Sequence, residues 1–397
     1  MSDTAIHAGL RVAGWNVEFT RGPDESSVAF AGIYQVRGNR LVTFRDVCDD
    51  LRLCFEISND AADGGGGDNN SDPWAGIAFY LTSEYCEPPD ARPYWPSFVT
   101  QELGLDMPVP CLSPWKHQEQ GAVRYHVVFH TPCDLPSHSR LDAHLQARCA
   151  RHLPDIVTRC DPRYLPPPDN ATLTSMPFSP GTTSELEIML GRAGMEVDAE
   201  GAREHMNDFR SRCITMANCC AVSGEGATWG PNPIAGPALE ACHIIPQQHY
   251  HLYPSSTSDQ QSDNDETVEE SARRLLDAWE RTWSLNNGIL LKGDLRACFD
   301  ARLFSIHPST LLVRVFVPYD FLINFNGRKA LVPKLVNKTA LRHHYEMCCI
   351  ENMAALTLSF AFMRSRTCKI EAGQDSRGRK RRRSEDDRVI QSSPEDI

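Results

Sequence analysis

Apolar and polar residues in the first part of the chain follow patterns typical of strands. Short runs of β-forming residues lie between turn residues at positions 17–19, 32–36, 41–44, 51–57, 77–81 and 124–130. Residues 37–40 separate two of these runs at hairpin distance. One helix is expected over about residues 140–152. We therefore predict a β-rich N-terminal domain of mixed character, whose role the sequence does not indicate.

This region offers few candidates for chemistry. It contains no phosphate-binding glycine loop and no spacing typical of a catalytic triad. His126 and His130 alternate on one predicted strand, where a core or surface role is favoured over metal ligation.

Residues 63–72, rich in Gly, Asn and Asp, predict a surface loop inside the first domain. The composition changes after residue 161, because residues 162–180 are rich in Pro, Ser and Thr. We place the domain boundary there. The predicted division is an N-terminal domain at 1–161, a linker at 162–182, a second domain at 183–370 and a disordered tail at 371–397.

Helices and strands alternate in the second domain. Helical segments are expected at 198–212, 268–283 and 339–363, with strands at 303–306 and 311–317. The apolar stripe over 268–283 favours core packing over stacking on nucleic-acid bases. His343 and His344 are adjacent on a helix, so they cannot both face one metal ion, and we expect a structural or surface role for them.

Composition narrows the class of protein. Hydrophobic residues make up 41% of the 397 positions, charged residues 23%, and the net charge is −12. Fifteen cysteines without a CxxC pair give no zinc-ribbon signal, and no N-terminal run resembles a signal peptide. The longest apolar run, 354–363, is about half of what a bilayer requires. We expect an intracellular, soluble protein with reduced cysteines and no membrane span.

Three pieces of the stretch from residue 213 to 308 belong together. Cys-Cys-Ala-Val-Ser-Gly occupies 219–224, Leu-Glu-Ala-Cys-His-Ile-Ile-Pro occupies 239–246, and Asn-Asn-Gly-Ile-Leu-Leu at 286–291 leads into Phe-Asp at 299–300. This order resembles the HNH nuclease family, including the HNH domains of many fungal proteins. The resemblance implies an α+β fold in which a β-β-α metal unit of the HNH type (a His-Me finger) follows the β-rich domain.

The resemblance also implies roles for individual residues. His243 would be the general base that deprotonates water, and Asn287 would hold the loop that positions it. Asp300 would bind the divalent metal ion, Mg²⁺ or Mn²⁺, whereas Cys242 suits packing better than a hard ion. The family usually places a histidine where this chain has Arg296, and a guanidinium cannot bind a metal ion.

Positive charge gathers toward the C-terminus. Residues 287–370 hold 12 Lys or Arg against 5 Asp or Glu. Arg296, Lys292 and Arg302 are candidates for contacts with nucleic-acid phosphates, and Arg314, Arg328 and Lys329 extend the set. In the tail, Arg379, Lys380, Arg381, Arg382 and Arg383 resemble a nuclear import signal that an import receptor would bind. A disordered arm that binds nucleic acid is the rival interpretation.

These observations leave two hypotheses. The first is a nuclear HNH-type endonuclease that hydrolyses phosphodiester bonds with a divalent metal, weakened by Arg296, with DNA favoured over RNA as its partner. The second is a catalytically inactive nuclear protein that keeps the HNH fold and binds nucleic acid or regulates another process.

Overall fold

The computed structural model describes residues 8–22, 27–36, 41–57, 72–82, 96–111, 122–136, 139–159, 199–227, 236, 238–253 and 276–355. The predicted hairpin turn at 37–40, most of the loop at 63–72, the linker, the first part of the helix at 268–283 and the basic tail lie outside these residues.

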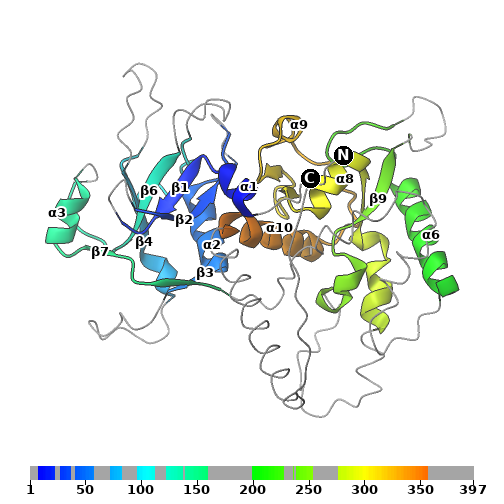
Figure 1. Cartoon of the computed structure of the whole chain (residues 1–397), viewed down its shortest axis with the longest axis horizontal. Coiled ribbons are helices and arrows are strands. Elements are labelled where there is room, and N and C mark those ends of the chain that lie inside the picture. The colour runs from blue at the N-terminus through cyan, green and yellow to red at the C-terminus, as the bar shows by residue number, and fades with distance from the viewer. Residues whose placement is uncertain are drawn as a thin grey trace, which may run out of the picture.

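A mixed six-stranded sheet organises the N-terminal half (Figure 1). Its strands run in the order β2-β1-β6-β4-β5, and β7 pairs with the remaining length of β6. Only the β1–β6 pair is parallel among these neighbours. The bounds are β1 Val17–Thr20, β2 Ala29–Ile33, β4 Ile77–Leu81, β5 Phe98–Val99, β6 Val123–His130 and β7 Ala150–His152.

Helices cover the two faces of this sheet unequally. The long helix α2 (Phe44–Cys54) packs on one face, where Phe44 lies in aromatic contact with Phe79 and Tyr125. On the other face, the described residues contribute the short helix α3 (Leu141–Gln146) and a small apolar cluster around Phe98. The main core of this half is therefore on the α2 side.

Helix α2 replaces most of the two strands predicted near residue 50, and its capping explains why. Thr43 and Asp46 form a reciprocal capping box, so the helix begins at Phe44, and an isolated bridge of Thr43 with Pro108 remains of the strand expected at 41–44. Helix α2 continues to Cys54, and only β3 (Phe55–Ile57) remains of the predicted 51–57 strand; it pairs with β8 (Ile156–Thr158). The predicted helix at 140–152 ends at Gln146 and gives way to β7.

The C-terminal half has its own apolar core. Helix α6 (Ala199–Met216) leads to the antiparallel pair β9 (Leu239–His243) and β10 (Gly288–Lys292), which helix α8 (Gly293–Asp300) follows directly. A second antiparallel pair, β11 (Phe304–Ile306) and β12 (Val313–Val315), precedes the short helix α9 (Asp320–Ile323). Short 3-10 turns follow β9 at η5 (Gln247–Leu252) and precede β10 at η6 (Leu285–Asn287); in the N-terminal half, η2 (Pro73–Gly76) leads into β4.

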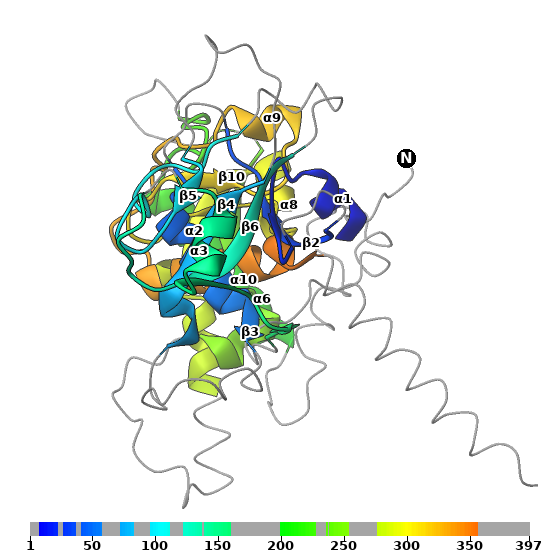
Figure 2. The ribbon, with the colours of Figure 1, turned by 90° about the vertical axis from the view of Figure 1, so that its left-hand side faces the viewer.

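Helix α10 (Lys338–Met353) joins the two halves (Figures 1 and 2). Its first turns add Leu341 to the C-terminal core, and its last turns add Ile350 and Met353 to the N-terminal core. Buried polar groups reinforce this seam. Glu351 forms ion pairs with Arg11 of helix α1 (Ala8–Ala13) and with Arg302. The Asn352 side chain accepts a hydrogen bond from the Arg11 guanidinium and donates one to the Arg302 carbonyl.

None of the helices among the described residues combines the length and the apolar character that crossing a bilayer would require.

Candidate functional site

The β9–β10 pair and helix α8 bring the three sequence motifs together. His243, the last residue of β9, pairs in register with Gly288, the first residue of β10. A side chain at Gly288 would collide with α6, because a Cβ atom there would lie 2.5 Å from Cys213 Sγ and 2.9 Å from the Phe209 ring. The glycine of the Asn-Gly motif therefore allows α6 to approach the hairpin closely.

The Asn287 side chain joins the segment that follows β9 to the segment that precedes β10. Its Oδ1 accepts a hydrogen bond from the Ile245 amide at 2.9 Å, and its Nδ2 donates to the carbonyls of Ile245 (2.8 Å) and Thr282 (2.9 Å). The side chain is fully buried. All three bonds hold backbone next to His243, which is the arrangement that a positioning residue needs.

His243 lies among aromatic rings. Its imidazole stacks on Phe209, with centroids 4.0 Å apart, and meets the edge of Trp283 at 5.0 Å. Burial in this setting lowers the pKa of His243 to about 3, and the positive charge of Arg296 adds to the effect. The side-chain nitrogen of Gln247 lies 2.8 Å from Nδ1 and 3.0 Å from Nε2, so this amide covers the nitrogen edge of the ring.

Helix α8 presents Arg296 and Asp300 to the opposite face of β9. The Arg296 guanidinium donates to Glu240 Oε2 at 2.7 Å and lies 3.5 Å from Asp300 Oδ2. Cys242 is buried beside them, with its Sγ 3.6 Å from Asp300 Oδ1. Arginine, two carboxylates and a thiol thus form one contiguous polar cluster.

Comparison with known proteins adds one finding. Residues 220–307 match the model of the HNH endonuclease family. We call this segment the HNH unit, after the family that it resembles. The match runs from the turn before β9 through β11 and contains the site just described except for the contacts from α6. No curated protein and no solved structure matches the chain.

The residues of the HNH unit do not fit a divalent metal ion of the kind the family implies. Both carboxylates that could supply oxygen ligands, Glu240 and Asp300, are paired with Arg296. Burial raises the pKa of the Cys242 thiol well above its ordinary value, which keeps it protonated and unable to act as a ligand. Mg²⁺ and Mn²⁺ require free oxygen donors, and a cation would have to displace a guanidinium to obtain them.

The basic residues predicted to contact phosphates occupy different settings. Lys292 is paired with Glu225 at 2.8 Å, and Arg302 is buried in its ion pair with Glu351, so Arg302 presents no free charge at the surface. Arg314 is buried as well. Arg328 and Lys329 are exposed. The cluster at Arg379–Arg383 lies outside the described residues.

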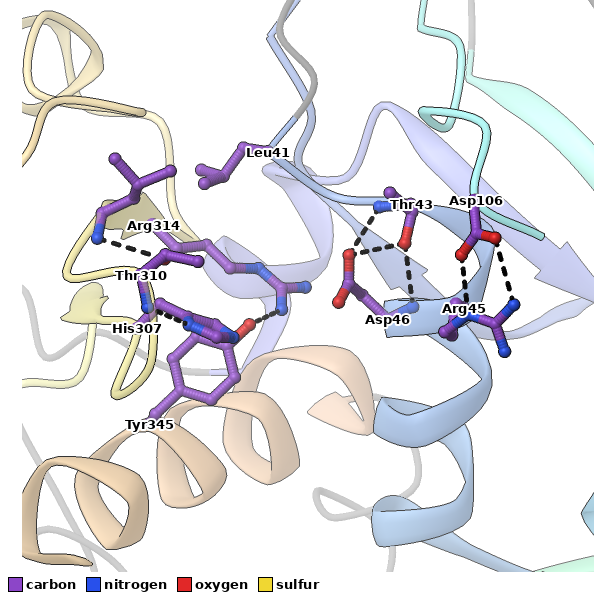
Figure 3. A pocket seen from close by; sticks show the side chains of 10 residues that line it. Leu41, Thr43, Arg45, Asp46, Asp106, His307, Thr310, Arg314 and Tyr345 are labelled. Atoms are coloured by element: carbon purple, nitrogen blue, oxygen red, sulfur yellow. Dashed lines mark hydrogen bonds and ion pairs between the residues drawn. The ribbon is translucent and has the colours of Figure 1, made fainter. Parts of the chain in front are cut away.

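A hollow of about 350 Å³ lies where α2, the β11–β12 turn and α10 meet (Figure 3). Its polar side chains are already paired: Arg45 with Asp106 at 2.7 Å, and Arg314 with the Tyr345 hydroxyl. Nδ1 of His307 accepts from the backbone amide of Thr310 at 3.2 Å. The hollow belongs to the seam between the two halves, because both halves line it and Arg314 also pairs with Asp50 of α2.

Sequence reasoning did not single out Glu240, Gln247 or Phe209. Glu240 could have been found, since it lies two residues before Cys242 and therefore on the same face of the strand. Gln247 and Phe209 gave no such signal, because their contacts with His243 depend on how η5 and α6 fold back on the hairpin.

Proposed function

We propose that the HNH unit binds nucleic acid and hydrolyses phosphodiester bonds far more slowly than HNH units with a histidine at position 296. The observation that carries this proposal is the double ion pair of Arg296 with Glu240 and Asp300. It neutralises the two carboxylates and places a fixed cation at the position where the family holds its metal. No catalytic step through a metal is derived for this chain.

The state of His243 supports the same conclusion. A general base works best when its pKa lies near the operating pH, because it must both be unprotonated and attract a proton. A pKa of about 3 satisfies only the first condition. The Gln247 amide also covers the ring nitrogens that water would have to reach. The β9–β10 pair and the hydrogen bonds of Asn287 are present. The fold of the site is therefore kept, although the general base is not tuned for catalysis.

An exposed basic strip beside the HNH unit supports binding. Residues 328–342 contain five Lys or Arg and no acidic residue. The backbone fastens this strip to the unit, since Leu331 N donates to Ala221 O at 2.7 Å and Asn337 N to Asn286 O at 2.8 Å. All five cations are exposed: Arg328, Lys329, Lys334, Lys338 and Arg342. Such a strip can contact successive phosphates without reading sequence.

Fluorescence anisotropy with a labelled DNA duplex, repeated with duplex RNA, tests the binding surface. We expect the combined charge reversal Arg328→Glu, Lys329→Glu and Lys334→Glu to weaken binding at least about tenfold and to reduce the salt slope, which is about 0.9 per phosphate contact. Lys292→Gln is the matched control, because its ammonium is already paired with Glu225. Equal affinity for the reversed and wild-type proteins would place the interface elsewhere.

A plasmid-nicking assay with Mg²⁺ and Mn²⁺ tests the catalytic half of the proposal. We expect little nicking by the wild type and a gain in both metal affinity and nicking for Arg296→His, with Arg296→Gln as the control that removes the charge without adding a ligand. Calorimetry measures the metal affinity directly.

A metal-dependent endonuclease is the second candidate, and the presence of two carboxylates, Glu240 and Asp300, around one point beside strand β9 favours it. This candidate requires Arg296 to leave the cluster. Strong wild-type nicking that is lost in His243→Ala would establish it and overturn the first.

A further inference from the structure

Four side chains that can bind metal meet at the end of the N-terminal half, far from the HNH unit. His130 ends strand β6, Cys133 follows it in the turn, His144 lies on helix α3, and Cys149 precedes strand β7. Their nearest ligand atoms all lie within 4.8 Å of one another. In Figure 1, α3 and β7 lie at the opposite end of the molecule from α6 and β9.

Three of the six distances between these atoms match the sulfur–nitrogen edges of a tetrahedron around one zinc ion. Cys133 Sγ lies 3.4 Å from His130 Nε2 and 3.6 Å from His144 Nδ1, and Cys149 Sγ lies 3.4 Å from His144 Nδ1. Zinc bound to sulfur at about 2.3 Å and to nitrogen at about 2.0–2.1 Å places these two ligands about 3.5 Å apart. All three measured edges fall within 0.1 Å of that value.

Hydrogen bonds among the four groups are the alternative to a metal ion. Both thiols converge on the same His144 Nδ1, which carries a single lone pair in the plane of its ring. Each thiol also has a second acceptor: His130 Nε2 for Cys133, and the His144 carbonyl oxygen, at 3.3 Å, for Cys149. A cation at the centre would instead give all four side chains the same partner.

Few other interactions stabilise helix α3 and the turn that leads from it to β7. Helix α3 has six residues, and no side chain caps its start at Arg140. A helix of this length is unstable on its own, and the apolar cluster beneath it is small. Arg148 adopts a left-handed backbone conformation with φ of 59°, which turns Cys149 back toward the histidines. A positive φ at a residue with a side chain costs free energy that a bound ion would offset.

Neither cysteine of the cluster is held in a disulfide bond. The two cysteines are free and half-buried, which leaves their thiols accessible to an incoming ion.

We propose that His130, Cys133, His144 and Cys149 form a structural zinc site that fastens helix α3 and strand β7 to the end of strand β6. A set of two thiolates and two imidazoles binds zinc in preference to Mg²⁺ or Mn²⁺. Four protein ligands leave no open position for water or substrate, so the site stabilises the fold and performs no reaction. It is independent of the HNH unit and of any ion there.

The experiment measures zinc in the full-length protein purified under reducing conditions without added metal or chelator. We expect about one zinc per chain, released on treatment with a thiol-modifying mercurial. Cobalt exchanged into the site should give the visible absorption of a tetrahedral ion and a thiolate-to-cobalt charge-transfer band. Removal of zinc with a strong chelator should lower the Tm, and zinc added back should restore it; this readout needs no variant.

Matched variants assign the ligands. Cys133→Ser combined with Cys149→Ser should abolish zinc content and the charge-transfer band. Two control variants should leave both unchanged: His152→Ser, at a neighbouring histidine outside the cluster, and Cys219→Ser, directly before the HNH unit. Three results would overturn the proposal: wild-type protein with less than about a tenth of a zinc per chain and no cobalt spectrum, a Cys133–Cys149 disulfide in the reduced preparation, or full zinc content in the double variant.

Discussion

Asp50 and Arg314 form a buried ion pair, 2.9 Å between Oδ2 and Nη1, that joins helix α2 of the N-terminal half to strand β12 of the C-terminal half. Both side chains are almost fully buried, at 6% and 3% exposure. The Arg314 guanidinium also lies over the Phe316 ring and donates to the Tyr345 hydroxyl. The two halves are thus held by paired charge as well as by the apolar faces of α10.

Removing one partner of this pair should be strongly destabilising, because the other charge stays buried without compensation. We expect Asp50→Leu to lower the free energy of unfolding by about 3–5 kcal/mol. The double variant Asp50→Leu with Arg314→Met should recover much of that loss, since it buries no unpaired charge. Urea unfolding followed by tryptophan fluorescence measures both. Asp106→Asn, which breaks an exposed pair with Arg45, is the control and should change the midpoint little; a similar loss there would contradict the argument.

His344 should make the fold sensitive to acid. Its Nε2 lies 3.1 Å from the Phe299 carbonyl and its Nδ1 2.8 Å from Ser305 Oγ, and burial lowers its pKa from 6.5 to about 3. Between these values the unfolded chain binds a proton that the folded chain does not. Stability is therefore present above pH 6.5 and is lost as the pH falls below it, by up to about 1.4 kcal/mol per pH unit.

Unfolding measured from pH 7.5 to 4.5 tests this dependence. His344→Gln should be less stable at neutral pH but should show a shallower decline toward acid. The exposed His205→Gln serves as control and should keep the wild-type slope. An unchanged slope in His344→Gln would show that other groups set the acid sensitivity.

Asn287 should matter more to folding than His243 does. Asn287→Ala removes three hydrogen bonds and leaves buried backbone groups of Ile245 and Thr282 unpaired, a cost of about 1–3 kcal/mol for each unsatisfied group. His243→Ala loses aromatic contacts worth about 0.5–1.5 kcal/mol each and should shift the Tm by only a few degrees. Calorimetric Tm values for the two variants test the order. Collapse of the fold in His243→Ala would identify this histidine as a core residue.

We also propose that the basic tail directs the protein to the nucleus. A fluorescent reporter fused to residues 371–397 should concentrate there, because Arg379–Arg383 is a run of five cations of the kind that import receptors bind. Replacing these five residues with Gln should spread the reporter evenly. Even distribution of the unaltered fusion would contradict the proposal and leave nucleic-acid binding as the role of the tail.

Local sequence determined much of this protein. Strands β1, β4 and β6, helix α6 and the β9–β10–α8 order follow from patterns that act over a few residues: apolar alternation, helical spacing and the Asn-Gly turn. Short sequence motifs named His243, Asn287 and Asp300 as candidates, and the structure places them at the ends of β9, η6 and α8. Their functional roles stay predictions. One position of the sequence was enough to show that Arg296 replaces a family histidine.

Only the tertiary structure decided which charged groups pair and which side chains meet in one site. Arg302 resembled a phosphate contact in the sequence, but Glu351, 49 positions away, buries it in an ion pair. The strand expected at 41–44 gave way to α2 because the Thr43 capping box and packing against the sheet outweighed β propensity. Arg296 could have been a free cation until Glu240 of the neighbouring strand was placed beside it. His130, Cys133, His144 and Cys149 have no CxxC spacing, and they meet because strand β6, helix α3 and strand β7 fold back on one another. Long-range pairing of charge and of metal ligands depends on the path of the whole backbone, which no local pattern of residues contains.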